Sequence, residues 1–426
     1  MKETTIRIER YGVIIYVPQR FCYYNILDEK LADMFKNRRI DDVKTMFSVE
    51  YKLLCLDKNE VRYVDNSEID SNTFVPLEAY FDYTSKCNMH CSYCYNRDNL
   101  NDITMPKNMV KKVFDDFYDL GIMRVHLAGG EPTIDYEGLK NYLEYGNSKN
   151  MHISIATNGS MLNDDICELL TKSNLISVSI SIDSSIEEIN DVKRGKQSFK
   201  RAYEGIIKLL KYKYKNHSNI EICIKPVFSF ELTRKDIYDM LSLSEKLKID
   251  KLKFSNPERC EYHSIGYYGK NKSLYYENIR LLNDVIKEYA GSIKITTITN
   301  PASFDFDIGI AGNKGCIGGQ ELITINPNGS ITPCLMNHYN LGSVYDYANL
   351  KEFLETSEKL LAYKKMIYNE ACDSCKSYSG CRGGCQVRKK VEYGEIKGKD
   401  PLCINFEEKT QNSKKVLKRV NIYHSL

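Results

Sequence analysis

Three cysteines lie within eight residues of the chain, in the segment CNMHCSYC. They are Cys87, Cys91 and Cys94, and they follow the strand-like stretch FDYTSK directly. Thiolates at this tight spacing can converge on one face of an iron–sulfur cubane and leave one iron without a protein ligand. A small molecule can bind at that open iron. We therefore expect the fourth ligand to be a substrate or a cosubstrate.

Two other interpretations of this loop are a zinc site and a group of free thiols. A zinc ion would need His90 as its fourth ligand. His90 directly precedes Cys91, and adjacent residues in a short loop rarely point at the same metal ion. The spacing therefore favours a cluster with a vacant position.

A second group of cysteines follows residue 315. Cys316 comes first, Gly329 then leads to Cys334 as G-x-x-x-x-C, and a C-x-x-C pair and three single cysteines follow. The remaining members are Cys372, Cys375, Cys381, Cys385 and Cys403. A zinc ribbon is the alternative, because C-x-x-C is its usual half-site. Seven thiols do not divide into tetrahedral sites, so iron–sulfur binding is favoured.

The bulk composition limits the class of protein. The chain has 426 residues, with 60 Lys and Arg against 57 Asp and Glu, so its net charge is +3. This balance predicts no nucleic-acid partner, and no apolar run reaches the length of a membrane span. The charged start, MKETTIRIER, is unlike a signal peptide. We expect a cytoplasmic protein, in which 15 cysteines indicate metal binding rather than disulfides.

Residues 77–300 alternate between strand-like and helix-like stretches. The strand candidates are LEAYFDY, MRVHLA, HISIA, LISVSISI, NIEICIK and KLKF. Asn163 and Thr233 are expected helix caps. Strands separated by helices predict parallel βαβ units, and hence an α/β fold with either a partial (β/α)6 TIM-type barrel or a doubly wound sheet. Function is expected at the carboxyl ends of the strands.

Residues 1–76 and the tail have a different character. Residues 1–76 predict a small α+β domain with a hairpin around Lys58 and Asn59, and the last twenty residues predict a solvated helix. Residues 301–426 form the cysteine-rich remainder.

Further motifs end the next three strands. Gly129 and Gly130 begin GGEP, and paired glycines let the backbone approach a ligand closely. Glu131 offers an acceptor for an ammonium group. Thr157-Asn158-Gly159 ends the third strand, and Ser181 and Asp183 end the fourth with short polar side chains that suit ribose hydroxyls.

The cysteine loop and these motifs, in this order, resemble radical S-adenosylmethionine (SAM) enzymes. The resemblance implies a 4Fe–4S cluster on the first three cysteines and SAM bound at its open iron. In the family, GGEP holds the methionine amino group, a cation meets the methionine carboxylate, and an aromatic residue packs near the adenine. The implied SAM contacts are Tyr93, Gly129, Gly130, Glu131, Asn158, Ser181, Asp183 and Arg194.

The seven later cysteines resemble the SPASM pattern of the same enzymes, which carries two auxiliary 4Fe–4S clusters. By position, Cys372, Cys375, Cys381 and Cys403 would complete one cluster, whereas Cys316, Cys334 and Cys385 would hold the other with three thiolates. The total is therefore three clusters. We hypothesise that a peptide cysteine thiolate can occupy the vacant auxiliary position.

The resemblance implies reductive cleavage of SAM and removal of a hydrogen atom from a precursor peptide made by the ribosome. Thioether formation is our leading hypothesis, with an external reductant of the flavodoxin or ferredoxin type. Residues 1–76 are then expected to be a winged-helix-like domain that binds a leader peptide, or else a structural cap. The alternatives are other peptide oxidations or carbon–carbon crosslinks, a non-catalytic electron carrier, and formylglycine formation. Against the last, Leu335 stands where that branch has an aspartate.

Overall fold

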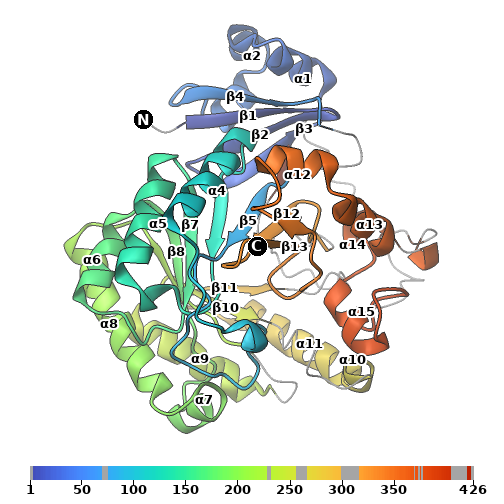
Figure 1. Cartoon of the computed structure of the whole chain (residues 1–426). Coiled ribbons are helices and arrows are strands. Elements are labelled where there is room, and N and C mark those ends of the chain that lie inside the picture. The colour runs from blue at the N-terminus through green and yellow to red at the C-terminus, as the bar shows by residue number, and fades with distance from the viewer. Residues whose placement is uncertain are drawn as a thin grey trace.

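The computed structural model of the chain organises its residues around two sheets. It describes residues 3–69, 75–227, 232–255, 266–298, 316–368, 370–372, 375, 378–403 and 420–423. A five-stranded sheet lies at one end, above the larger sheet and its helices, and the C-terminal helices lie beside them (Figure 1). Among the described helices, none is both long and apolar enough to cross a membrane.

The five-stranded sheet has the order β15-β3-β2-β1-β4. Its elements are β1 (Glu3–Glu9), β2 (Gly12–Val17), β3 (Cys22–Ile26), α1 (Glu29–Lys36), α2 (Ile40–Met46), α3 (Ser48–Leu53), β4 (Glu60–Asn66) and β15 (Val420–Tyr423). The predicted hairpin around Lys58 and Asn59 is wrong, because α3 precedes this turn and β4 pairs in parallel with β1. The predicted tail helix is also wrong over β15, which pairs antiparallel with β3.

The ten-stranded sheet contains all six predicted strands. They are β5 (Glu78–Phe81), β6 (Arg124–Leu127), β7 (His152–Thr157), β8 (Leu175–Ile180), β9 (Glu221–Ile224) and β10 (Lys251–Ser255). Further strands that the sequence did not predict are β11 (Lys294–Ile298), β12 (Leu322–Ile325), β13 (Ser330–Thr332) and β14 (Gly342–Ser343). Strands β5 to β11 are parallel and neighbour one another in chain order, and β12 adds in parallel to β5.

This strand order decides between the two predicted architectures. A doubly wound sheet reverses its strand order, whereas β5 to β11 follow one another without reversal. Right-handed crossovers then place the connecting helices on one face of the sheet. Among the described strands, β11 and β14 are the two edges of the sheet and do not pair with each other. The predicted partial barrel of the α/β class is confirmed.

The helices follow the strands and cover one face of the sheet. Asn163 accepts a hydrogen bond from the Ile166 amide, and Thr233 forms a capping box with Asp236, so both predicted caps are confirmed. The helices are α4 (Lys107–Leu120), α5 (Tyr136–Ser148), α6 (Asp164–Lys172), α7 (Glu187–Arg194), α8 (Ser198–Lys215), α9 (Arg234–Leu247), α10 (Tyr267–Lys270), α11 (Lys272–Glu288), α12 (Leu350–Thr356), α13 (Glu358–Ile367), α14 (Tyr378–Cys381) and α15 (Gln386–Tyr393).

The sheet has one apolar and one polar face. Phe81 on β5 is fully buried, and its ring lies 5.3 Å from that of Phe114 on α4. Val125 and Ile153 on the adjacent strands are buried in the same core. The alternate positions carry polar side chains, among them His126 and Ser154, because successive residues of a strand point to opposite faces. The interior of the barrel is therefore lined by polar groups.

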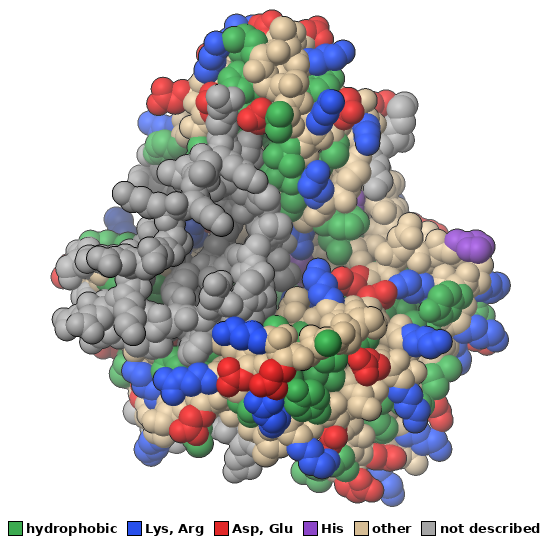
Figure 2. Space-filling view, turned by 180° about the vertical axis from the view of Figure 1, so that it is seen from behind, with side chains coloured by type: hydrophobic (Ala, Val, Ile, Leu, Met, Phe, Trp, Pro, Cys, Tyr) green, Lys and Arg blue, Asp and Glu red, His purple; other side chains and the backbone are tan. Residues whose placement is uncertain are grey.

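Charged side chains of both signs are spread over the described part of the rear face of the molecule (Figure 2). In Figure 2 the Lys and Arg side chains are interspersed with Asp and Glu over the described part of the rear face. This distribution agrees with the near balance of 60 basic and 57 acidic residues in the chain.

Buried hydrogen bonds join the N-terminal sheet to the start of the barrel. Arg7 donates to the carbonyls of Val75 and Pro76, at 3.0 and 2.8 Å. The Tyr23 hydroxyl accepts from the Met123 amide at 2.8 Å and donates to the Gly121 carbonyl at 3.3 Å. The N-terminal sheet therefore packs at the amino ends of β5 and β6, away from the expected site.

Replacement of Tyr23 by phenylalanine tests this contact. The change leaves the buried Met123 amide without its acceptor, so we expect Tyr23→Phe to lower the free energy of unfolding by about 1–2 kcal/mol. Chemical denaturation followed by circular dichroism measures the effect. Tyr214→Phe is the matched control, because Tyr214 is exposed. An equal loss of stability in both variants would contradict the prediction.

Candidate functional site

The three-cysteine loop follows β5 at the carboxyl end of the barrel. Cys87, Cys91 and Cys94 are each half-buried. The loop is fixed to the end of β7 and to helix α7: Asn158, after β7, donates to Asn88 at 2.9 Å, and the Ser92 amide donates to the carbonyl of Lys193 in the last turn of α7 at 2.9 Å. The loop thus lies where the parallel strands converge, as predicted for a site of this fold.

The GGEP segment packs closely against the backbone of this loop. The Glu131 amide donates to the carbonyl of Lys86 at 2.7 Å, and the Gly130 amide donates to that of Thr84 at 3.2 Å. A Cβ atom on Gly130 would lie 2.2 Å from the Lys86 oxygen. Gly129 has a φ of +63°, which favours glycine. In the structure, both glycines let the backbone approach the start of the cysteine loop.

The Glu131 carboxylate connects the ends of β6 and β7. It accepts hydrogen bonds from the Thr133 amide and hydroxyl, from the Thr157 hydroxyl at 2.6 Å and from the Asn158 amide at 2.7 Å. A carboxylate has about four acceptor positions. Burial raises the pKa of Glu131, and these donors lower it. Glu131 therefore positions the strand ends, while its contact with a methionine amino group stays a prediction.

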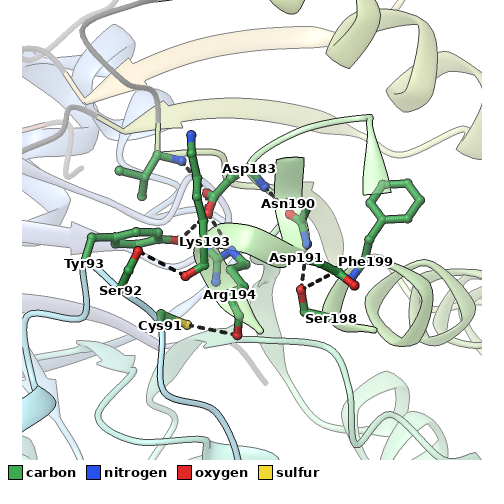
Figure 3. A network of polar contacts seen from close by, with 11 residues as sticks. Cys91, Ser92, Tyr93, Asp183, Asn190, Asp191, Lys193, Arg194, Ser198 and Phe199 are labelled. Carbon is green, nitrogen blue, oxygen red and sulfur yellow. Dashed lines mark hydrogen bonds and ion pairs between the residues drawn. The ribbon is translucent and has the colours of Figure 1, made fainter. Parts of the chain in front are cut away.

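A buried ion pair connects the fourth strand end to the cysteine loop. Asp183 accepts from Arg194 Nε at 2.7 Å and from Nη2 at 3.1 Å, and its side chain is 0% exposed. The Tyr93 hydroxyl donates to the same carboxylate, and the Arg194 guanidinium lies 5.4 Å from the centroid of the Tyr93 ring (Figure 3). Three predicted SAM contacts therefore lie together.

Other predicted contacts lie at the same edge. Ser181 is half-buried, and its amide donates to the Thr157 carbonyl at 3.0 Å. Asn190 on α7 accepts from the Asp183 amide at 2.9 Å and was not predicted from the sequence. The structure thus places the Ser181 backbone beside the end of β7, while the roles of Ser181 and Asp183 toward SAM stay predictions.

The thiols of the loop influence one another electrostatically. The pKa of Cys87 is raised to about 12, mainly by burial and in part by the nearby Glu131, Cys91 and Cys94. Burial also raises the pKa of Cys91, which the Arg194 cation lowers. Metal coordination requires thiolates, so the positive charge of bound iron would have to offset this burial.

The C-terminal cysteines fall into two electrostatic groups. Burial raises the pKa of Tyr363, and Cys316, Cys334 and Cys385 raise it further. Burial raises the pKa of Cys403, and the nearby Cys372 and Cys375 also raise it. Burial likewise raises the pKa of Cys381, with contributions from Cys403 and Cys372. These groups have the same members as the predicted sets of three and four.

A histidine connects the C-terminal cysteine region to the first loop. His338 lies shortly after Cys334, and its Nε2 is 3.3 Å from the carbonyl oxygen of Tyr95. Its Nδ1 is 3.4 Å from the side-chain nitrogen of Asn99. Both partners immediately follow the three-cysteine loop in the chain, so the two cysteine-bearing regions are in direct contact.

Sequence reasoning missed an ionisable group inside the barrel. His126 lies 3.1 Å from Glu78 and also contacts Ser154, so adjacent strands supply all three side chains. Burial lowers the pKa of Lys253 on β10 to about 8. The signal in the sequence is the alternation of apolar and polar residues along each strand.

Comparison with known proteins decides the family. Residues 82–243 match the radical SAM superfamily, and residues 316–377 match the SPASM iron–sulfur cluster-binding domain. The chain belongs to the radical SAM superfamily and carries a SPASM domain. It is therefore an enzyme.

Three relatives illustrate this membership. Fe-coproporphyrin III synthase of Methanosarcina barkeri is 25% identical over 76% of this chain and 87% of its own. The antilisterial bacteriocin subtilosin biosynthesis protein AlbA of Bacillus subtilis is 26% identical over 75% of this chain and 69% of its own. The crystal structure of Streptococcus suis SuiB bound to SAM has a TM-score of 0.70 and 20% identity, and covers 95% of this chain and 99% of SuiB.

The cofactors of this radical SAM enzyme follow from its two domains. The first domain uses a 4Fe–4S cluster with SAM, and the SPASM domain brings the auxiliary clusters, as predicted. Within the described residues, no three His, Cys, Asp or Glu side chains are arranged to hold a single metal ion. The fit of the residues to clusters therefore rests on the cysteine spacing and on the mutual electrostatic effects of the thiols.

Replacement of Gly130 by alanine tests the packing of GGEP against the loop. The added Cβ would collide with the backbone at Lys86, so we expect Gly130→Ala to displace the loop and to lower the iron content by about four atoms per chain, which is one cluster. Iron analysis after anaerobic reconstitution measures this. Gly12→Ala should retain all iron, because its Cβ would meet only Asn25, at 3.9 Å. Full iron content in Gly130→Ala would contradict the prediction.

Asp82, directly after β5, should make the stability of the fold depend on pH. Burial raises its pKa from 3.8 to about 7. Because the folded protein binds the Asp82 proton more tightly than the unfolded chain does, protonation of Asp82 stabilises the fold. This contribution to the free energy of unfolding is complete below pH 4 and is lost as the pH rises through 7. Between pH 5 and 7 we expect the wild type to lose roughly 2 kcal/mol of unfolding free energy relative to Asp82→Asn. Denaturation curves at both pH values measure this, and parallel pH profiles would refute it.

Proposed function

We propose that this enzyme removes a hydrogen atom from a ribosomally made precursor peptide and forms a thioether between a cysteine sulfur and a carbon. The set of Cys316, Cys334 and Cys385, whose thiols all act electrostatically on Tyr363, carries the proposal. Three thiolates leave one position of a cubane for an external ligand. A peptide cysteine is a ligand of the same chemistry, and it would be held beside the barrel.

The names of the relatives support a peptide substrate. AlbA is named for subtilosin biosynthesis, and SuiB has been solved with its precursor peptide SuiA. The likeness to SuiB covers 95% of this chain, which includes most of the N-terminal sheet. Because a chain of this fold has been solved with a precursor peptide, a peptide is the substrate class that we propose.

In this proposal Cys87, Cys91 and Cys94 hold the first cluster. A cluster and SAM held there would supply a 5′-deoxyadenosyl radical, after one-electron reduction by a flavodoxin- or ferredoxin-type partner, and this radical would take one hydrogen atom from the peptide carbon. When the carbon–sulfur bond forms, the thiol proton would go to solvent and the second electron to an auxiliary cluster. Gly129, Gly130 and Glu131 shape the methionine end of the SAM site, and Asn158, Ser181 and Asp183 lie where ribose hydroxyls would be bound. Arg194 provides the cation for the methionine carboxylate, and Tyr93 provides the ring beside the adenine.

The Asp183–Arg194 pair would keep this pocket in shape. Asp183 also accepts from the Val227 amide at 2.9 Å, so it fixes the start of the segment after β9. Removing one partner of a buried pair leaves the other charge uncompensated. The pair therefore fixes the direction of the Arg194 guanidinium before SAM arrives.

The N-terminal unit, residues 1–76, would bind the leader of the precursor peptide as an added strand. Strand addition uses main-chain hydrogen bonds, and so tolerates variable sequences. In the described sheet β15 covers the edge of β3, and β4 forms the other end. A leader strand would therefore add beside β4 or take the place of β15.

Formylglycine formation has less support. Leu335 is half-buried directly after Cys334, where the proton-accepting aspartate of that branch would stand. Asp305 and Asp307, the remaining candidates for this role, lie outside the described residues. A thioether between a cysteine sulfur and a carbon is therefore the reaction that we propose in place of formylglycine formation.

The proposal predicts two separate products. After anaerobic reconstitution, dithionite and SAM should yield 5′-deoxyadenosine. A cysteine-containing peptide encoded beside the gene should lose two hydrogen atoms and one free thiol, which mass spectrometry with thiol alkylation detects. Cys87→Ala should abolish both products, whereas Cys167→Ala should retain both, because Cys167 is buried in α6. Deoxyadenosine with an unmodified peptide thiol would exclude the thioether, and no deoxyadenosine would exclude the radical chemistry.

A further inference from the structure

Lys389 on α15 is a buried lysine. It is 0% exposed, and within the described part of the chain its Nζ has no hydrogen-bond partner. Its backbone amide donates to the Cys385 carbonyl at 3.2 Å, which places it one helical turn after that cysteine. Burying an unpaired ammonium is energetically costly. The described residues supply no hydrogen-bonded negative charge to this ammonium, and a bound anionic group nearby would do so.

The neighbouring carboxylate does not meet this need. Asp400 accepts from Arg388 Nε and Nη2 at 3.1 and 2.6 Å, and from the amides of Cys385 and Leu402 at 2.6 and 2.9 Å. Arg388, also 0% exposed, thus forms the ion pair of this region. Asp400 acts on Lys389 only through its electrostatic field.

Thiols of both C-terminal cysteine groups lie within electrostatic range of Lys389. Burial lowers its pKa, and besides Asp400 the groups that oppose this effect are Cys372, Cys316 and Cys385. Cys372 belongs to the group of four, and Cys316 and Cys385 belong to the group of three. The ammonium is therefore one helical turn from Cys385 and within the electrostatic field of thiols from both groups. One turn earlier, the Gln386 side-chain oxygen is also buried without a partner.

We propose that Lys389 is a shared cation that raises the reduction potentials of both auxiliary clusters. Reduction adds one negative charge to a cluster, and a fixed cation nearby stabilises the reduced form. In turn, the negative charge of the thiolate-ligated clusters compensates the buried ammonium. The inference rests on the proposed binding of clusters by the C-terminal cysteines. It goes further by assigning a role to a residue outside every predicted ligand set.

Redox titration of the reconstituted holoenzyme, followed by electron paramagnetic resonance, tests this role. In Lys389→Met, the ratio of reduced to oxidised auxiliary cluster at a fixed potential should fall about tenfold, equal to a shift of about 59 mV to more negative potential for a one-electron couple. Lys389→Arg should keep the wild-type potentials. Lys390→Met, on the exposed side of the same helix, is the matched control and should also keep them.

Each outcome decides the proposal. Unchanged auxiliary potentials in Lys389→Met overturn it, and so does an equal shift in Lys389→Arg, because shape rather than charge would then be responsible. If Lys389→Met binds no auxiliary iron, retention of iron and potentials in Lys389→Arg supports the cation, and loss in both overturns it. Deoxyadenosine and thioether assays on the wild type report the proposed function separately, so the two ideas can fail independently.

Discussion

The parallel pairing of β5, β6, β7 and β8 brings four strand ends to one edge of the sheet. Each end carries one motif, and side chains cross between the ends. Glu131 connects the ends of β6 and β7, and Asp183 connects the end of β8 to Tyr93 in the cysteine loop. A loop of irregular backbone is thereby held in place by partners from three strands. A cluster site needs this fixation, because an irregular segment otherwise has many accessible conformations.

The two faces of the sheet explain how a parallel barrel can hold a substrate. Parallel sheets are usually apolar on both faces. Here Phe81 packs on α4, while Tyr80, beside it in the chain, lies 5.0 Å from the ring of His126 on the other face. The helices supply the hydrophobic core, so the interior side chains need not. Ionisable groups such as Lys253 can then lie inside the barrel where chemistry would occur.

The C-terminal unit faces a different physical problem, because it gathers acidic groups in a small volume. Seven cysteines and Asp400 occur between residues 316 and 403. Arg388 pairs with Asp400, and Lys389 has thiols of both cysteine groups near it. Arg388 and Lys389 are adjacent on α15, so one helix supplies two cations to this region. The contact between His338 and Tyr95 extends the same assembly to the first cysteine loop.

The sequence by itself determined the six barrel strands, the caps at Asn163 and Thr233, and the order of the motifs at the strand ends. These signals are local, because alternation, capping and motif spacing depend on residues close together in the chain. The sequence failed where a partner lies far away. Val61 on β4 pairs with Thr4 on β1, so this segment does not form the predicted hairpin. Val420 on β15 pairs with Ile26 on β3, so this part of the tail does not form the predicted helix.

Tertiary structure alone decided which charges meet. Motif spacing does not predict that Glu131 bonds to the end of β7, that Arg194 pairs with Asp183, or that Lys389 is buried. A side chain's partner is chosen only after the chain has closed the intervening loops, and burial then makes that choice energetically decisive.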